Sequence, residues 1–170
     1  MRIARLVVGL SLVLIASNAF GQKVTTDSVP GTDWSKFHTY SWAEGTPAQD
    51  PLVAQRIVAG IDARLAAKGL KKVDSDPDLV VMYHASADQQ KSLNWSNMGG
   101  WGRFGGMGSA QVDTVVTGQL KVDLADYKAK QFLWRGTASD TLSSDPQKNA
   151  KKIDKALTKM FQKFPPTPGK

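Results

Sequence analysis

The chain has 170 residues, no cysteine and a formal net charge of +7. This length suits one domain that buries enough apolar surface to fold without a metal or a disulfide. The lack of cysteine excludes disulfides, a thiolate nucleophile and cysteine-ligated zinc. Arg2 and Arg5 lie in a segment expected to be removed, so the net charge of the remaining chain falls to +5. Such a bias favours loose contact with anionic polymers or simply solubility, and it identifies no partner.

The first 21 residues have the pattern of a secretory signal peptide. A basic start, Met1–Arg5, precedes an apolar run, Leu6–Ala16, which is shorter than the roughly 20 residues that span a membrane. Ala19 and Gly21 then place small residues at the −3 and −1 sites, which predicts cleavage between Gly21 and Gln22. An uncleaved anchor is the alternative. No cysteine follows the cut, so no lipid anchor is expected, and no later run predicts a transmembrane span.

The segment after the cut predicts an extended, weakly ordered lead-in over residues 22–33, followed by a strand over Trp34–Trp42, which is aromatic and β-branched. Asp50-Pro51 then opens a helix, because aspartate caps free amides and proline suits the first helical position. Gly69 suits a left-handed stop, so the helix is expected over Pro51–Lys68. Its apolar stripe consists of Val53, Ile57, Ile61 and Leu65.

Asp78–Ala87 is apolar on both faces at its start, which predicts a strand in the middle of a sheet. Its polar continuation, Asp88–Asn94, is expected to extend the strand beyond the core as an arm. The glycine-rich stretch over residues 96–109 cannot form a stable helix or strand. We therefore expect a mobile loop between this arm and the next strand.

The clearest alternation lies in Val112–Leu124 and in Phe132–Ala138, which are joined by the polar connector Asp126–Lys130. Even positions carry the apolar side chains and odd positions carry most of the polar ones, so one face of each strand meets a core. The pattern predicts an antiparallel hairpin with one wet face. Phe132, Trp134 and Ala138 are expected to point inward.

A second helix opens at Asp145-Pro146 and stops before Pro165-Pro166. Since each helix has one apolar stripe, both should cover the same face of one sheet. The sequence thus predicts a single α/β domain over residues 34–166, with a tail at 167–170. Its expected form is a two-layer α+β sandwich with a four-stranded mixed, mainly antiparallel sheet in the order β-α-β-β-β-α. The first two strands are expected to be parallel neighbours.

Five segments together resemble the bacterial domain-of-unknown-function family 4136. They are Asp33–Trp42, Pro77–Ala85, the glycine-rich loop, Leu133–Ala138 and Lys159–Pro166. The resemblance covers nearly all of the chain after the cut, and it is the combination that is specific. It implies an exported envelope protein with no established activity and with no catalytic residues to transfer. Members are often lipoproteins, whereas this chain lacks the lipid-attachment cysteine.

The glycine-rich loop carries the candidate partner-binding residues Trp95, Trp101, Arg103 and Phe104. Aromatic rings beside a cation can stack on sugars or on side chains of a partner, so an envelope protein or a glycan is the expected partner, and nucleic acid is not. The alternative is that these rings pack on the edge of their own domain. Gly100–Gly105 also matches G-x-G-x-x-G, but a nucleotide site needs a strand before the motif and a helix within it. Here a strand follows.

The remaining polar residues favour structural roles, and no catalytic, cofactor-binding or metal-binding set is predicted. His38 and His84 are expected within strands as hydrogen-bonded structural residues, since they lack the spacing of metal ligands. Arg135 is free to pair with a carboxylate of the neighbouring strand, for which Asp113 and Asp123 are the candidates. The lysines of the last helix are interpreted as its solvated side, with a basic ridge for anionic glycans or lipid headgroups as the alternative.

These observations favour a soluble periplasmic protein of a Gram-negative bacterium that binds or scaffolds a partner without catalysis. A hydrolase acting on an envelope polymer through two carboxylates, roughly 5–10 Å apart across a cleft, is the alternative. A purely structural or stress-related protein is a third hypothesis.

Overall fold

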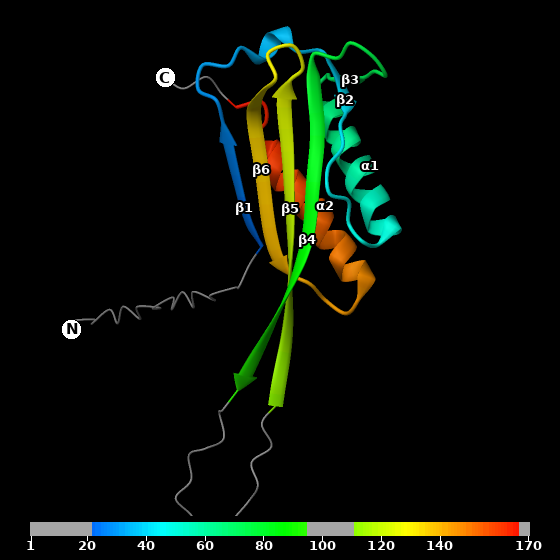
Figure 1. Ribbon diagram of the computed structural model, residues 1–170, viewed down its shortest axis with the longest axis vertical. Helices are drawn as coiled ribbons and strands as arrows, with labels where there is room; N and C mark the ends of the chain where they lie inside the picture. Colours follow the sequence, from blue (N-terminus) through cyan, green and yellow to red (C-terminus); the bar gives the residue numbers. More distant parts are fainter. Residues whose placement is uncertain (1–21, 95–110, 167–170) are drawn as a thin grey trace, which may run out of the picture.

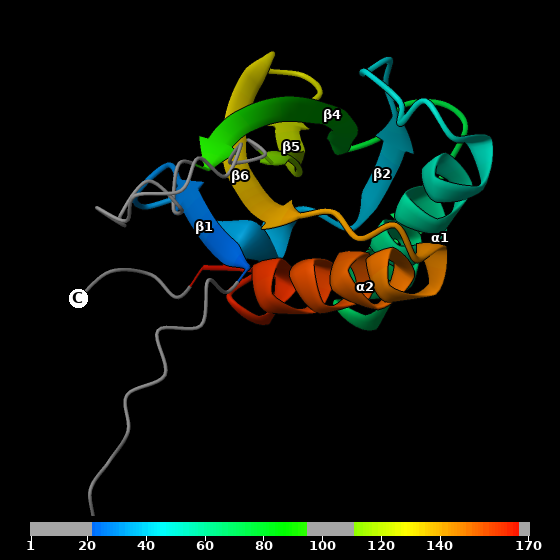
Figure 2. The same cartoon turned by 90° about the horizontal axis from the view of Figure 1, so that it is seen from below.

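The computed structural model describes residues 22–94 and 111–166. Their elements, in chain order, are β1 (Lys23–Ser28), a 3-10 turn η1 (Trp34–Lys36), β2 (Thr39–Trp42), α1 (Pro51–Ala67), β3 (Lys71–Lys72), β4 (Leu79–Asn94), β5 (Gln111–Asp126), β6 (Gln131–Thr141) and α2 (Pro146–Gln162). The strands form one sheet in the order β1-β6-β5-β4-β2-β3. Both helices cover the same face of this sheet, so the predicted two-layer α+β class is confirmed (Figures 1 and 2).

The prediction of four strands is wrong, because the sheet has six. The expected lead-in contains β1, which pairs antiparallel with β6. Its residues alternate between exposed and half-buried, but threonine and serine supply most of the inner face, so hydrophobicity gave no signal. The other additional strand, β3, has two residues and pairs with β2.

The predicted strand over Trp34–Trp42 is also too long, since Trp34–Lys36 form the turn η1. Asp33 stabilises this turn by accepting hydrogen bonds from the backbone N–H of Ser35 at 3.1 Å and from its hydroxyl at 2.6 Å. The strand β2 begins at Thr39 and lies parallel to β4. This confirms the parallel pairing that the sequence predicts for its first two strands. His38 precedes the strand and is exposed, so its expected place within a strand is wrong.

Both helices begin as the Asp-Pro pairs predict. The Asp50 carboxylate accepts from the Leu52 N–H at 2.8 Å, and the Asp145 carboxylate accepts from the Gln147 N–H at 2.8 Å. The chain leaves α1 through Gly69, whose φ of +86° is the left-handed conformation predicted there. Within the described residues, no helix is long and apolar enough to cross a membrane.

One hydrophobic core joins the helices to the sheet. Ile57 of α1, Leu157 of α2, Leu120 of β5 and Trp134 of β6 all belong to it, as the sequence predicts. Phe132 does not, because its side chain is 52% exposed. A register shift between Leu124 and Ala125 brings Trp134 opposite the first and Phe132 opposite the second. The intervening Leu133 is buried instead, so this β-bulge reverses the parity that the sequence pattern implied.

Asp78 ties the start of β4 to the start of β2. Its Oδ2 atom accepts from the His38 N–H at 2.9 Å, from the Thr39 N–H at 3.0 Å and from the Thr39 hydroxyl at 2.9 Å. The backbone hydrogen bond from His38 contributes most to holding the pKa of Asp78 below its usual value of 3.8. A carboxylate that accepts several hydrogen bonds favours its ionised form.

We expect this contact to make the folded state sensitive to acid. A folded-state pKa below the unfolded value gives stability that is complete above the ordinary value of 3.8 and is lost as the pH falls below it. The variant Asp78→Ala should therefore lose about 1–3 kcal/mol at pH 7 and less at pH 3, measured by urea unfolding at both values. The variant Asp78→Asn keeps an oxygen acceptor and should lose less at pH 7. An equal deficit of Asp78→Ala at the two pH values would contradict the assignment.

A candidate apolar binding pocket

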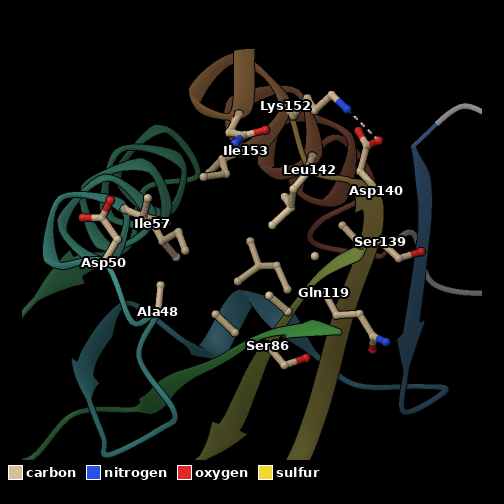
Figure 3. A pocket seen from close by; sticks show the side chains of 18 of the residues that line it. Ala48, Asp50, Ile57, Ser86, Gln119, Ser139, Asp140, Leu142, Lys152 and Ile153 are labelled. Carbon is tan, nitrogen blue, oxygen red and sulfur yellow. Dashed lines mark hydrogen bonds and ion pairs between the residues drawn. The ribbon is translucent and has the colours of Figure 1, made fainter. Parts of the chain in front are cut away.

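A pocket with a volume of about 460 Å³ opens at the end of the sandwich where α1 and α2 both begin. We call it the end pocket. Its walls come from the two helices, from the segment Thr46–Asp50 that precedes α1, and from β4, β5 and β6 (Figure 3). The volume lies within the range of roughly 300–1,000 Å³ that is typical of small-molecule sites.

Small side chains leave this space open. Five alanines and one glycine stand on walls where larger apolar residues would otherwise fill the core: Ala48, Ala85, Ala87, Gly118, Ala138 and Ala156. Ala138 and Ala156 are both buried, at 4% exposure each. Larger apolar residues from both helices, from β5 and from the position after β6 complete the wall, namely Val53, Ile57, Leu120, Leu142 and Ile153. The interior is therefore lined by carbon.

The polar lining residues labelled in Figure 3 lie at the rim or direct their polar groups away from the centre. Figure 3 shows the hydroxyls of Ser86 and Ser139 and the amide of Gln119 directed away from the centre. Lys152 extends its ammonium group to the Asp140 carboxylate at 3.1 Å, and it also donates to the Thr141 carbonyl. Asp50 serves as the N-cap of α1. The charged lining residues are thus already engaged in contacts within the fold.

A close backbone approach holds one wall in place. The Thr46 N–H donates to the Tyr83 carbonyl at 3.0 Å, and the Ala85 N–H donates to the Thr46 carbonyl at 2.8 Å. A Cβ atom on Gly45 would collide with the carbonyl oxygen of Tyr83, so only glycine allows this approach. The sequence Gly45-Thr46 therefore fixes the Ala48 side of the end pocket against β4.

The candidate partner-binding residues Trp95, Trp101, Arg103 and Phe104 lie outside the described residues. The predicted cleavage site between Gly21 and Gln22 lies at their border, since Gln22 is described and Gly21 is not. Whether the glycine-rich loop binds a partner stays a prediction.

Two predicted side-chain roles are confirmed. His84 lies in β4 and is hydrogen-bonded, because its Nδ1 atom lies 3.0 Å from the Thr46 hydroxyl. Arg135 pairs with Asp123, with Nε 2.5 Å from Oδ1 and Nη2 3.1 Å from Oδ2. Asp123 was expected on the wet face, yet it is only 2% exposed. Its hydrogen bond to the guanidinium group raises the pKa of Arg135.

Sequence reasoning missed the end pocket. The lysines of α2 were interpreted as a solvated face, and most are exposed, but Lys152 is half-buried on the pocket rim. The available signal was the pair of small residues at inward-facing strand positions, since Ala85 and Ala138 lie opposite Leu120 on its two neighbouring strands. Within residues 22–94 and 111–166, no cluster of three His, Cys, Asp or Glu side chains is placed to hold a metal ion.

The chain is similar to several solved structures at low sequence identity. The chain is similar to a PDZ domain protein from Parabacteroides distasonis with a TM-score of 0.58 and 16% identity, over 86% of this chain but only 36% of that one. It also resembles a minor lipoprotein from Acinetobacter baumannii, with a TM-score of 0.41, 14% identity and coverage of 75% and 92% of the two chains. A lipoprotein from Neisseria meningitidis gives a TM-score of 0.43, 13% identity and coverage of 74% and 98%.

No curated protein sequence matches the chain. A family profile does, and it extends from the second residue of β1 to the second of the two prolines after α2. With residues 24–166 matched, the chain belongs to the family described as a domain of unknown function, DUF4136.

Proposed function

We propose that this protein is an exported, non-enzymatic binding module of the bacterial envelope, and that it holds one uncharged aliphatic chain in the end pocket. The observation that carries the proposal is a carbon-lined pocket of about 460 Å³ whose walls are kept open by alanine and glycine. Transfer of each CH₂ group from water into such a pocket contributes about 0.8 kcal/mol. A chain of several carbons thus gains enough to offset the cost of its immobilisation.

The charges at the rim favour an uncharged occupant over an ionic one. Lys152 and Asp140 neutralise each other, and the Asp50 carboxylate accepts a helix N–H. An anionic headgroup would have to displace Asp140 from Lys152, and a cationic one would have to compete with Lys152 for Asp140. A neutral chain enters without breaking either contact. Where the chain belongs to a larger lipid, its headgroup therefore lies outside the end pocket.

A role in binding also accounts for the carboxylates that line the end pocket. The alternative of a hydrolase needs one carboxyl group as acid and another as base or nucleophile. Asp50 and Asp140 are the lining carboxylates, and each already accepts a hydrogen bond or pairs with a lysine.

Export by a cleaved signal peptide and a partner contact through the glycine-rich loop remain part of the proposal, on the basis of the sequence.

Filling the end pocket should abolish binding without unfolding the protein. We expect wild-type protein to bind the uncharged dye N-phenyl-1-naphthylamine, and dodecan-1-ol to displace it. The variant Ala156→Leu adds three carbons at a buried lining position, so its affinity should fall at least about 10-fold while its melting temperature is kept or raised. Fluorescence titration measures the first property and circular dichroism the second.

The matched control is Ala66→Leu, the same change at an exposed position of α1 away from the pocket lining. It should leave dye binding unchanged. If Ala156→Leu does not fold, Ala85→Leu fills the pocket from β4 instead. The proposal fails if the wild-type protein binds no dye, or if a folded pocket-filling variant binds it as tightly as the wild type does.

A further inference from the structure

Positive charge is concentrated on the two helices. α1 and α2 carry seven Lys or Arg residues and two Asp residues, which gives a net charge of +5. The other described residues carry eleven basic and thirteen acidic side chains, which gives a net charge of −2. Because both helices cover the same face of the sheet, the molecule has one basic side (Figure 2). An anionic partner is therefore attracted to the helices rather than to the open face of the sheet.

The two acidic residues of the helices already have partners within the fold. The Asp62 carboxylate accepts a hydrogen bond from the Tyr40 hydroxyl at 2.8 Å and one from the Trp42 indole at 2.9 Å. The Asp154 carboxylate pairs with Arg64 at 2.7 Å, and Arg64 also donates to the Asp154 carbonyl at 3.0 Å. These contacts join α1 to α2, so the outer sides of the two helices form one continuous surface.

The outer side of α2 carries a row of lysines. Lys151, Lys155 and Lys159 recur every four residues, and Lys148 lies three residues before the first of them, so all four lie on one face of the helix. We call them the lysine row. This face lies opposite to the buried Leu157. Among residues 22–94 and 111–166, no carboxylate lies within ion-pair distance of any lysine of the row. Their charge is therefore available to an anionic partner.

The outer side of α1 is apolar instead. Leu52, Ala59 and Ala63 are all exposed, and they lie on the face opposite to the buried Ile61. The Leu52 side chain is 70% exposed, and the next residue, Val53, lines the end pocket. A large exposed aliphatic side chain beside a row of cations is typical of proteins that bind at the interface of an anionic membrane.

We propose that the outer surface of α1 and α2 docks on an anionic lipid bilayer, with the lysine row on the headgroups and Leu52 at the acyl boundary. A bilayer uses both features, whereas a soluble anionic polymer would use the lysines alone. The choice of a bilayer also rests on the proposed function, because a bilayer supplies aliphatic chains beside the end pocket. Docking through Leu52 brings the acyl chains close to the lining residue Val53.

Vesicle binding tests the lysine row. We expect the wild-type protein to sediment with vesicles of equal parts phosphatidylglycerol and phosphatidylcholine, less so as salt is added, and not with vesicles of phosphatidylcholine alone. The triple variant Lys148→Gln/Lys151→Gln/Lys155→Gln should bind the anionic vesicles at least about 10-fold more weakly. The matched control makes the same three changes at exposed lysines outside the helices: Lys23→Gln/Lys91→Gln/Lys128→Gln. It should keep most of the binding.

The variant Leu52→Ser distinguishes a bilayer from a soluble polyanion. It leaves the charge of the helices unchanged, and it should weaken binding to the anionic vesicles at least about 3-fold because the leucine no longer enters the acyl boundary. Binding to soluble poly-L-glutamate should not change. The matched control is Val29→Ser, since Val29 is an exposed apolar residue outside the helices. It should bind vesicles as the wild type does.

Failure of this proposal can be told apart from failure of the proposed function, because dye binding is measured without vesicles. The triple lysine variant should bind N-phenyl-1-naphthylamine as the wild type does. A protein that binds the dye but not the anionic vesicles would overturn the docking proposal alone. The same conclusion would follow from an equal loss in both triple variants, which would indicate net charge rather than the helix surface, or from full vesicle binding by Leu52→Ser.

Discussion

Replacing Trp134 by alanine is expected to lower the free energy of unfolding by about 3–5 kcal/mol, as is usual when a large aromatic is removed from a core. The side chain is 2% exposed, and its ring centroid lies 5.3 Å from that of Phe161 and 5.3 Å from that of Phe164. Gly136 makes room for it, since a Cβ atom there would lie 2.7 Å from the indole. Urea unfolding followed by circular dichroism measures the change.

The variant Trp134→Phe should cost far less, below about 1.5 kcal/mol. It keeps a ring against Phe161 and Phe164, and it removes an indole N–H that is buried without an acceptor among the described residues. An unpaired buried donor costs about 1–3 kcal/mol, so its removal offsets part of the lost apolar area. A loss with phenylalanine as large as that with alanine would show that the indole shape, rather than ring contact, stabilises this core.

The helices and the central strands could be predicted because their signals are local and strong. Asp50-Pro51 and Asp145-Pro146 place a capping carboxylate and a proline where the first free amides need them, and both helices begin there. The arm over Asp88–Asn94 was also predicted, as a polar tail that continues the strand beyond its apolar part, and β4 extends to Asn94. These patterns depend on neighbouring residues alone, which is why they could be interpreted without the fold.

The errors arise where a distant contact decides the local structure. Polar Lys23–Ser28 becomes a strand because β6 offers it an edge. The turn over Trp34–Lys36 is the exception, because the neighbouring Asp33 caps it. Phe132 points outward because one residue of β6 bulges opposite Leu124 and Ala125. A β-bulge cannot be recognised from the alternation of residues along one strand, because it is an irregularity in the pairing with the neighbouring strand. The errors over Lys23–Ser28 and at Phe132 therefore concern strand pairing, which composition does not encode.

The end pocket was beyond sequence reasoning for a related reason. Alanine at one inward position is ordinary, and only the register of β4, β5 and β6 gathers Ala85, Gly118 and Ala138 around one space. The helix stripe that should fill this space supplies Ala156 there as well. The glycine-rich loop was predicted as the binding segment because its aromatic residues are easily recognised in the sequence. A pocket formed by small side chains can be recognised only when the strands and helices that line it are placed together.

Replacing Arg135 by leucine is expected to lower the free energy of unfolding by about 3–5 kcal/mol, and more than the reciprocal change Asp123→Leu does. The two sides of this ion pair are unequally buried, since the side chain of Asp123 is 2% exposed and that of Arg135 is 47% exposed. Loss of Arg135 leaves a carboxylate in the sheet without its two hydrogen bonds. Loss of Asp123 leaves a guanidinium that water and nearby Asp27 can still solvate.

The double variant Asp123→Leu/Arg135→Leu separates the cost of an unpaired charge from the value of the pair. It removes both charges from the same cross-strand position, so it should be more stable than Arg135→Leu alone, and the difference is measured in a double-mutant cycle by urea unfolding. Arg135→Lys is the matched control, because it keeps the charge but loses the two-point contact, and it should fall between the wild type and Arg135→Leu. If the losses from the two single variants simply add in the double variant, the carboxylate does not depend on its arginine, and burial of Asp123 is tolerated by the sheet itself.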